Sequence, residues 1–176
     1  MKIVLISHGN FAHIFPYLDH LCQKGDDVHW LQIAPGRKSY KNVKIYECFQ
    51  KSNLYLFKKF SYILSVPKIR KLLRFIQPDV INAHYASSAG VCSWLSNQHP
   101  YVVTVHGSDI VQRSRNKLSR FLLKKVFHSA ALINPVGQHL AVILKKLGID
   151  EQKIFPLTLG VPLDQLPFLP RRWDNN

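Results

Sequence analysis

Two short apolar segments of this chain each end in a histidine followed by small or polar residues. Residues 101–105 (Tyr-Val-Val-Thr-Val) lead into His-Gly-Ser-Asp, and residues 79–83 (Asp-Val-Ile-Asn-Ala) lead into His-Tyr. Apolar runs this short and this rich in β-branched residues predict buried strands. Since open α/β sheets bind their ligands at the carboxyl ends of the strands, we expect both groups to line one crevice for a polar ligand.

The residues that follow position 105 carry the side chains best suited to catalysis. His106 can donate or accept a proton near neutral pH, and Asp109 could hold its imidazole in one tautomer. Ser108 and Asp109 also carry oxygen atoms that could cap the next segment or bind sugar hydroxyls. Gly107 would let a ligand approach the backbone. We predict His106 and Asp109 as catalytic residues and Gly107 and Ser108 as substrate-binding residues; the alternative is a capping turn with an incidental histidine.

Two weaker patterns add to the predicted substrate site. His84 and Tyr85 follow one apolar segment, and Gly9 and Asn10 follow another at residues 2–7. A glycine between a strand and a helix lets backbone N–H groups approach a phosphate at the helix N-terminus. The pattern is not Gly-x-Gly-x-x-Gly, so the sequence gives little support to a dinucleotide site. Plain turns are the alternative at both places.

The elements that must position these residues alternate along the chain. We expect strands at residues 2–7, 28–33, 43–48, 79–83, 101–105, 131–134 and 153–157, and helices at 11–24, 54–65, 68–76, 87–97, 117–128 and 138–147. This alternation predicts an α/β fold with a Rossmann-like, doubly wound parallel sheet. Residues 1–160 are expected to form this domain. Residues 161–176 hold three prolines and no periodic pattern, so we predict a linker there.

Charge is the most biased part of the composition. The formal net charge is +14, with 11 Lys or Arg and one acid between residues 37 and 74, and six bases and no acid between residues 113 and 125. Such fields attract phospholipid surfaces, nucleic acids or phosphorylated substrates, although a solvated basic face is the alternative. The amphipathic segment 54–65 places tyrosine and lysine on one side, which suits a membrane interface. We predict a patch for a membrane or an anionic acceptor at Lys58, Lys59, Lys68, Arg70, Lys71 and Arg74.

Several function classes are disfavoured. The three cysteines are far apart and the nine histidines show no metal-ligand spacing, so we expect neither a disulfide framework nor a metal or other cofactor. No run approaches the roughly 20 apolar residues of a membrane span. We therefore expect a cytoplasmic protein, peripheral to the inner face of the membrane. No nucleic-acid-binding motif is present, so no nucleic-acid partner is expected. A non-enzymatic module that binds anionic lipid or nucleic acid through its basic face remains the alternative.

Four segments together resemble a known family. The first strand, its Gly9 turn and the helix before Gly25 resemble the family's first unit. Residues 78–85 (Pro-Asp-Val-Ile-Asn-Ala-His-Tyr) resemble its P-D-(V/I)-(I/V)-H-A-H segment, and residues 103–109 resemble its H-G-(S/T)-D strand end. Residues 148–168 resemble its G-(V/I)…K-(I/V)…N-G-V-D…F segment. The chain thus resembles the N-terminal half of a family-four (group 1) retaining glycosyltransferase with the GT-B fold.

The resemblance implies two Rossmann-like domains that face each other across a cleft. This chain would be the acceptor-side domain, and the donor-binding C-terminal domain would lie outside it, so the chain alone is expected to have little activity. The implied reaction transfers a sugar from a nucleotide-sugar donor to an acceptor, such as a lipid-linked or phosphorylated glycan, with retention and without a metal. His106 would face the reacting sugar with Asp109 near it, and Gly9 and Asn10 would approach the donor phosphates.

This sequence departs from the family pattern at three of the matched segments, and in the last of them Pro162 and Leu163 alter the G-V-D element. Asn10 stands where many members have glycine, and Asn82 where histidine is common. An epimerase with the same two-domain fold is a further alternative.

Overall fold

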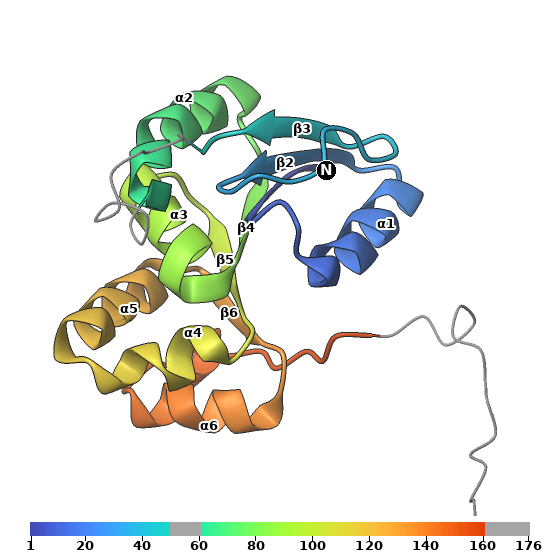
Figure 1. Cartoon of the computed structure of the whole chain (residues 1–176). Helices are drawn as coiled ribbons and strands as arrows, with labels where there is room; N and C mark the ends of the chain where they lie inside the picture. Colours follow the sequence, from blue (N-terminus) through green and yellow to red (C-terminus); the bar gives the residue numbers. More distant parts are fainter. Residues whose placement is uncertain (50–60, 161–176) are drawn as a thin grey trace, which may run out of the picture.

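A single parallel sheet forms the centre of the computed structural model, which describes residues 1–49 and 61–160. Its six strands follow the order β3-β2-β1-β4-β5-β6 (Figure 1). All five neighbouring pairs are parallel. The predicted Rossmann-like, doubly wound sheet is therefore confirmed. The strands are β1 (Lys2–Ser7), β2 (Asp27–Gln32), β3 (Lys44–Glu47), β4 (Val80–His84), β5 (Tyr101–Val105) and β6 (Leu132–Pro135).

The strand order reverses between β1 and β4. The chain builds β1, β2 and β3 toward one edge, then crosses back to place β4 on the other side of β1 and continues to β5 and β6. Ile6 of β1 lies opposite Ala83 of β4, so the segments that leave these two strands begin side by side. A crevice opens at such a reversal point in doubly wound sheets, outside the carboxyl ends of the strands.

Helices cover both faces of the sheet. Helix α1 (Phe15–Gln23) packs on one face, where Leu18 meets Leu5 and Trp30 in a small core. Helices α2 (Val66–Ile76), α3 (Val91–Ser96) and α5 (Lys117–Ser129) lie on the opposite face over the larger core (Figure 1). Short helix α4 (Ser108–Val111) and helix α6 (Gln138–Lys146) complete the β6 end. The remaining turns are η1 (Ala12–Ile14), η3 (Ser61–Ser65), η4 (Tyr85–Gly90), η5 (Arg113–Arg115) and η6 (Glu151–Lys153).

The prediction of a seventh strand at residues 153–157 is wrong. Residues Glu151–Lys153 form a 3-10 turn, and only one isolated bridge follows, between Ile133 and Ile154. The N–H groups of Phe155 and Leu157 still donate to Ile133 and Pro135 at 2.9 and 3.1 Å. Pro135 has no N–H with which to donate a hydrogen bond back to this segment, so the strand pairing between β6 and the segment cannot continue.

Helix starts also differ from the prediction. The helix expected from residue 11 begins with the 3-10 turn η1, and the one expected from residue 87 is preceded by a π-helical turn, η4. Helix α2 starts at Val66, ahead of the expected residue 68, because Pro67 occupies its first turn, where no N–H is needed. Most of the predicted helix 54–65 lies outside the described residues, and residues 61–65 are 3-10. No helix in the described ranges is long and apolar enough to cross a membrane.

Gly9 and Gly36 press their backbones together at the carboxyl end of β1. A Cβ atom on either glycine would overlap backbone atoms of the other, and Gly9 is buried. The loop after β2 therefore closes over the first turn. This close packing gives Gly9 a structural role that does not depend on a bound phosphate.

We expect Gly9→Ala to lower the free energy of unfolding by about 1–3 kcal/mol, because the added methyl group has no space without a backbone shift. Gly160→Ala is the matched control, since a Cβ there meets nothing within 4 Å. Urea unfolding followed by circular dichroism compares the two variants. Equal stabilities would show that the loop yields and that the packing is not tight.

Candidate functional site

Aromatic rings from three strand ends gather at the reversal point of the sheet. Tyr85, which follows β4, stacks on His106, which follows β5, with ring centroids 4.3 Å apart and an interplanar angle of 14°. Phe11 stacks on Tyr85 at 4.6 Å, and His13 stacks on His106 at 5.6 Å. The two strand ends that the sequence placed in one crevice do meet. The turn after β1 adds Phe11 and His13, which sequence reasoning missed although the same strand-end rule applies to them.

Tyr85 adopts an unusual backbone conformation. Its φ is +76°, in the left-handed region that bulky residues avoid. Such a conformation costs on the order of 1–3 kcal/mol and persists only where the surroundings enforce it. Here Tyr85 opens the π-helical turn η4, and its ring contacts both Phe11 and His106. The strain aims the tyrosine ring across the strand ends.

His84 and His106 form a direct hydrogen bond. Nδ1 of His84 lies 3.2 Å from Nε2 of His106, and the Tyr17 ring lies nearly perpendicular to the His84 ring, with centroids 4.9 Å apart. His84 is 2% exposed. Burial, with a smaller contribution from neighbouring imidazoles, lowers the pKa of His84 to about 3 and that of His106 to about 4. Both rings are therefore neutral at neutral pH, and one N–H is shared between them.

The surroundings of His84 favour one tautomer. Its Nε2 is buried without a hydrogen-bond partner among the described residues. A proton there would be a buried donor without an acceptor, which is costlier than a bare lone pair. We therefore assign the proton of His84 to Nδ1, from which it donates to Nε2 of His106. A neutral His106 then carries its own proton on Nδ1.

Asp109 holds the two loops together. Its carboxylate accepts hydrogen bonds from the backbone N–H of Ala86 at 2.8 Å and of Gly107 at 2.9 Å. Among the described residues, no hydrogen bond joins this carboxylate to the imidazole of His106, whose Nε2 pairs with His84 instead. Asp109 is 2% exposed; burial raises its pKa, while these backbone hydrogen bonds lower it. Asp109 thus positions the segments that carry Tyr85 and His106.

Two cavities open beside this cluster. One of about 440 Å³ lies at the β1–β4 reversal, and Phe11 and Tyr85 form part of its wall. Its polar groups include His8, whose Nε2 lies 3.3 Å from the hydroxyl of Ser88. Of the other predicted residues, Ser108 is exposed and lines this cavity. Gly107, which is buried with φ of +116°, and Asn10, which is exposed at the turn after β1, are not among its lining residues. The lining comprises His8, Phe11, Ile33, Ala34, Ser61, Tyr62, Tyr85, Ser87, Ser88, Ser108 and Arg113.

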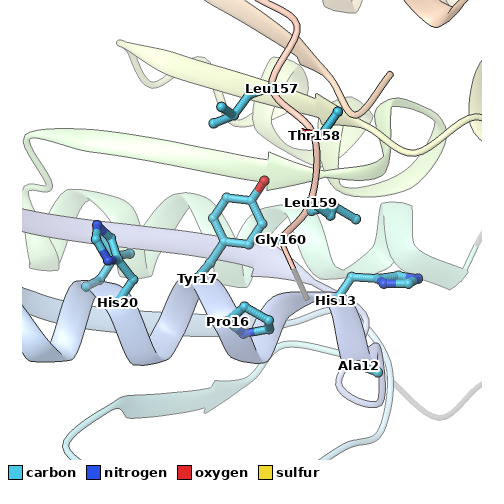
Figure 2. A pocket seen from close by; sticks show the side chains of 10 residues that line it. Ala12, His13, Pro16, Tyr17, His20, Leu157, Thr158, Leu159 and Gly160 are labelled. Atoms are coloured by element: carbon cyan, nitrogen blue, oxygen red, sulfur yellow. The ribbon is translucent and has the colours of Figure 1, made fainter. Parts of the chain in front are cut away.

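The second cavity, of about 320 Å³, separates α1 from the segment that follows residue 156. Figure 2 shows Tyr17 projecting from α1 toward this segment, with His13 nearby. Asn134 links the two sides: its Nδ2 lies 3.5 Å from the Tyr17 hydroxyl, and its Oδ1 accepts from the N–H of Leu157 at 3.1 Å. The cavity wall is mainly apolar, in contrast to the serine-rich cavity at the reversal point.

Only part of the predicted basic patch is described by the structure and free of protein hydrogen bonds. Lys58 and Lys59 lie outside the described residues. Lys68, Lys71 and Arg74 are exposed on α2. Arg70 instead donates to the backbone carbonyls of Leu95 and Ser96, at the C-terminal end of α3, where a cation is favoured by the helix dipole. Within residues 1–49 and 61–160, no group of three or more His, Cys, Asp or Glu side chains could hold a metal ion.

A family model described as "Glycosyl transferase 4-like" matches residues 2–134. The chain belongs to this glycosyl transferase 4-like family. TuaC of Bacillus subtilis (strain 168), named as a teichuronic acid biosynthesis glycosyltransferase, is 30% identical over 115 residues, which cover 52% of this chain and 30% of TuaC. A pyrophosphoryl-undecaprenol N-acetylglucosamine transferase of Wigglesworthia glossinidia brevipalpis is 27% identical over 113 residues, or 54% of this chain and 31% of that protein.

Solved structures share the fold of this member of the glycosyl transferase 4-like family. Anabaena HepE in complex with UDP and glucose superimposes with a TM-score of 0.67 at 14% identity, covering 93% of this chain and 46% of HepE. A UDP-GlcNAc 2-epimerase of Methanocaldococcus jannaschii gives a TM-score of 0.63 at 16% identity, covering 89% of this chain and 45% of the epimerase. The chain thus spans about a third of the curated relatives it matches and less than half of these solved chains.

The buried histidine pair makes stability depend on pH. The pKa values of His84 and His106 fall from 6.5 to about 3 and about 4 on folding. Between pH 6.5 and 4 the unfolded chain therefore binds more protons, so the free energy of unfolding falls as the pH falls. Each histidine adds up to about 1.4 kcal/mol per pH unit in that window. We expect His84→Asn to flatten this slope in urea titrations between pH 7 and 5.

His128→Asn is the control, because His128 is exposed on α5. It should leave the slope of the wild-type chain unchanged. A slope that is the same in all three proteins would show that neither His84 nor its coupling to His106 drives the loss of stability in acid.

Proposed function

We propose that this chain is the acceptor-side domain of a retaining glycosyltransferase that transfers a sugar from a nucleotide-sugar donor to a glycan or lipid-linked acceptor. The observation that carries the proposal is the neutral His84–His106 pair at the strand reversal, beside a serine-lined cavity, in a chain of the glycosyl transferase 4-like family. The donor domain would be a second domain outside this chain. This is consistent with relatives and solved chains more than twice as long as the matched region.

The geometry suggests a division of labour within the site. With Nε2 occupied by His84, His106 would present Nδ1–H as a hydrogen-bond donor to a sugar hydroxyl. Phe11 and Tyr85 would give the acceptor apolar contacts in the cavity wall, and Ser88 and Ser108 would bind its hydroxyls. Transfer needs neither a metal nor another cofactor in this proposal. The stacked rings hold these groups before substrate arrives, which lowers the entropic cost of reaching the transition state.

The names of relatives guide the choice of acceptor. TuaC is named for teichuronic acid biosynthesis, and the Wigglesworthia protein for an acceptor attached to pyrophosphoryl-undecaprenol. HepE was solved with UDP and glucose. These names support a UDP-sugar donor and an acceptor that is a cell-envelope glycan or its lipid-linked precursor.

The protein would work in the cytoplasm at the inner face of the membrane. Lys68, Lys71 and Arg74 form an exposed basic stripe on α2, and Phe75 beside them is 81% exposed. Cations near an anionic bilayer gain about 1 kcal/mol each, and an aromatic ring can enter the interface. A non-enzymatic lipid-binding module would share this surface, so the sugar-transfer test below distinguishes the two functions.

We expect His106→Ala, in the protein that includes a donor domain, to lower turnover by about 100- to 1000-fold, the range seen when one aimed hydrogen-bond donor is lost. The circular dichroism spectrum should stay close to that of the wild type, which shows that the fold is kept. His128→Ala serves as the control. Wild-type turnover in His106→Ala would remove His106 from the site, whereas interconversion of free nucleotide sugars without an acceptor would indicate an epimerase.

Flotation with anionic and neutral liposomes tests the membrane surface. We expect the chain to float with anionic vesicles only, and the triple variant Lys68→Gln, Lys71→Gln and Arg74→Gln to float less. A second triple variant, Lys24→Gln, Lys38→Gln and Lys146→Gln, removes the same charge from exposed positions elsewhere and should keep binding. Equal partition into both kinds of vesicle would refute an electrostatic membrane surface.

A further inference from the structure

The serine-lined cavity at the strand reversal adjoins an apolar recess. A smaller cavity of about 90 Å³ lies between α3 and α5. Tyr62, Ser87 and Arg113 line both cavities. One side of this junction is polar, with the hydroxyls of Ser88 and Ser108. The other side is lined by Val91, Leu118, Ser119, Leu122 and Leu123.

Among the residues that the structure describes, Arg113 is the only charged residue that lines either cavity. It belongs to the turn η5, just before α5. No acidic side chain lines the two cavities, and the salt bridges found within the described ranges do not involve Arg113. Its guanidinium lies close enough to Tyr62 to oppose the rise in pKa that burial causes in that phenol. Among the described residues, Arg113 is thus a cation without a counterion at the junction.

Apolar side chains continue outward from the recess along α5. Leu118 is 69% exposed and Phe121 is 57% exposed, although both lie on a helix with a buried face of its own. Five Lys or Arg side chains follow Arg113 between residues 115 and 125, and no acid interrupts them. Exposed leucine and phenylalanine among cations suit a ligand that is both anionic and apolar.

We propose that the acceptor is a lipid diphosphate or phosphate bound across this junction. Arg113 binds the phosphate, the recess between α3 and α5 takes the first unit of the lipid chain, and the rest of the chain runs along Leu118 and Phe121. The head group that receives the sugar then lies in the serine-lined cavity beside Tyr85 and His106. A guanidinium pairs well with phosphate oxygens because its donors form a planar fork. This inference rests on the proposed sugar transfer and names its acceptor.

Binding of farnesyl diphosphate to this chain tests the proposal without a donor domain. Titration calorimetry below the micelle concentration should show binding that is at least about tenfold tighter than for inorganic diphosphate or for farnesol, because each of these lacks one half of the ligand. Arg113→Gln should weaken farnesyl diphosphate at least about tenfold, as expected for loss of a charge-assisted pair. Leu118→Ser, at an exposed position, should weaken farnesyl diphosphate and leave inorganic diphosphate unchanged.

Arg115→Gln is the matched control, since Arg115 is exposed in the same turn and lines neither cavity. Equal effects of Arg113→Gln and Arg115→Gln would overturn the assignment and leave a diffuse basic surface. Inorganic diphosphate that binds as tightly as the farnesyl compound would reduce the site to one for free phosphate.

The lipid acceptor and the proposed sugar transfer can be refuted independently of each other. Sugar transfer to a soluble glycan by the two-domain protein, unaffected by Arg113→Gln, would refute the lipid acceptor and keep the transferase. Farnesyl diphosphate binding that depends on Arg113, in a two-domain protein that transfers no sugar, would support the lipid site and refute the transferase.

Discussion

The carboxylate of Asp109 holds the site in place. It accepts one hydrogen bond from the loop after β4, at Ala86, and one from the loop after β5, at Gly107. A buried carboxylate is costly unless it is well hydrogen-bonded, so these two contacts are strongly maintained. They fix the spacing between Tyr85 and His106. The stacked rings and the histidine pair depend on that spacing.

The site combines rigidity with an unusual protonation state. Burial keeps His84 and His106 neutral at neutral pH, and their shared hydrogen bond leaves each with a defined tautomer. The left-handed backbone at Tyr85 is locally unfavourable, and it places the tyrosine ring against His106. A site built this way presents fixed hydrogen-bond donors to a neutral polar ligand such as a sugar. The cationic function is left to Arg113, at the far end of the cavity.

Strand-end chemistry was predictable because it follows from alternation alone. Parallel strands all present their carboxyl ends at one edge, so His84 and His106 were expected at the same edge once both segments were recognised as strands. Their direct contact depends on the adjacency of β4 and β5 in the sheet. Other outcomes depended on single residues whose effects are visible only in pairs. Pro135 stops the expected seventh strand because it has no N–H to offer to the segment around Ile154. The need for glycine at position 9 follows from its close backbone contact with Gly36, which lies 27 positions later in the sequence.

The sequence by itself determined the fold class, the edge of the sheet that carries the site and the family resemblance, because these depend on periodicity and on short local motifs. Only the tertiary structure decided the partners of each polar group. Asp109 binds backbone N–H groups rather than an imidazole, the exposed Arg70 donates to the carbonyls at the end of α3, and Arg113 joins two cavities. The physical reason is that hydrogen bonds and ion pairs require specific distances and directions between atoms. Elements far apart in the chain set those distances only when they pack together.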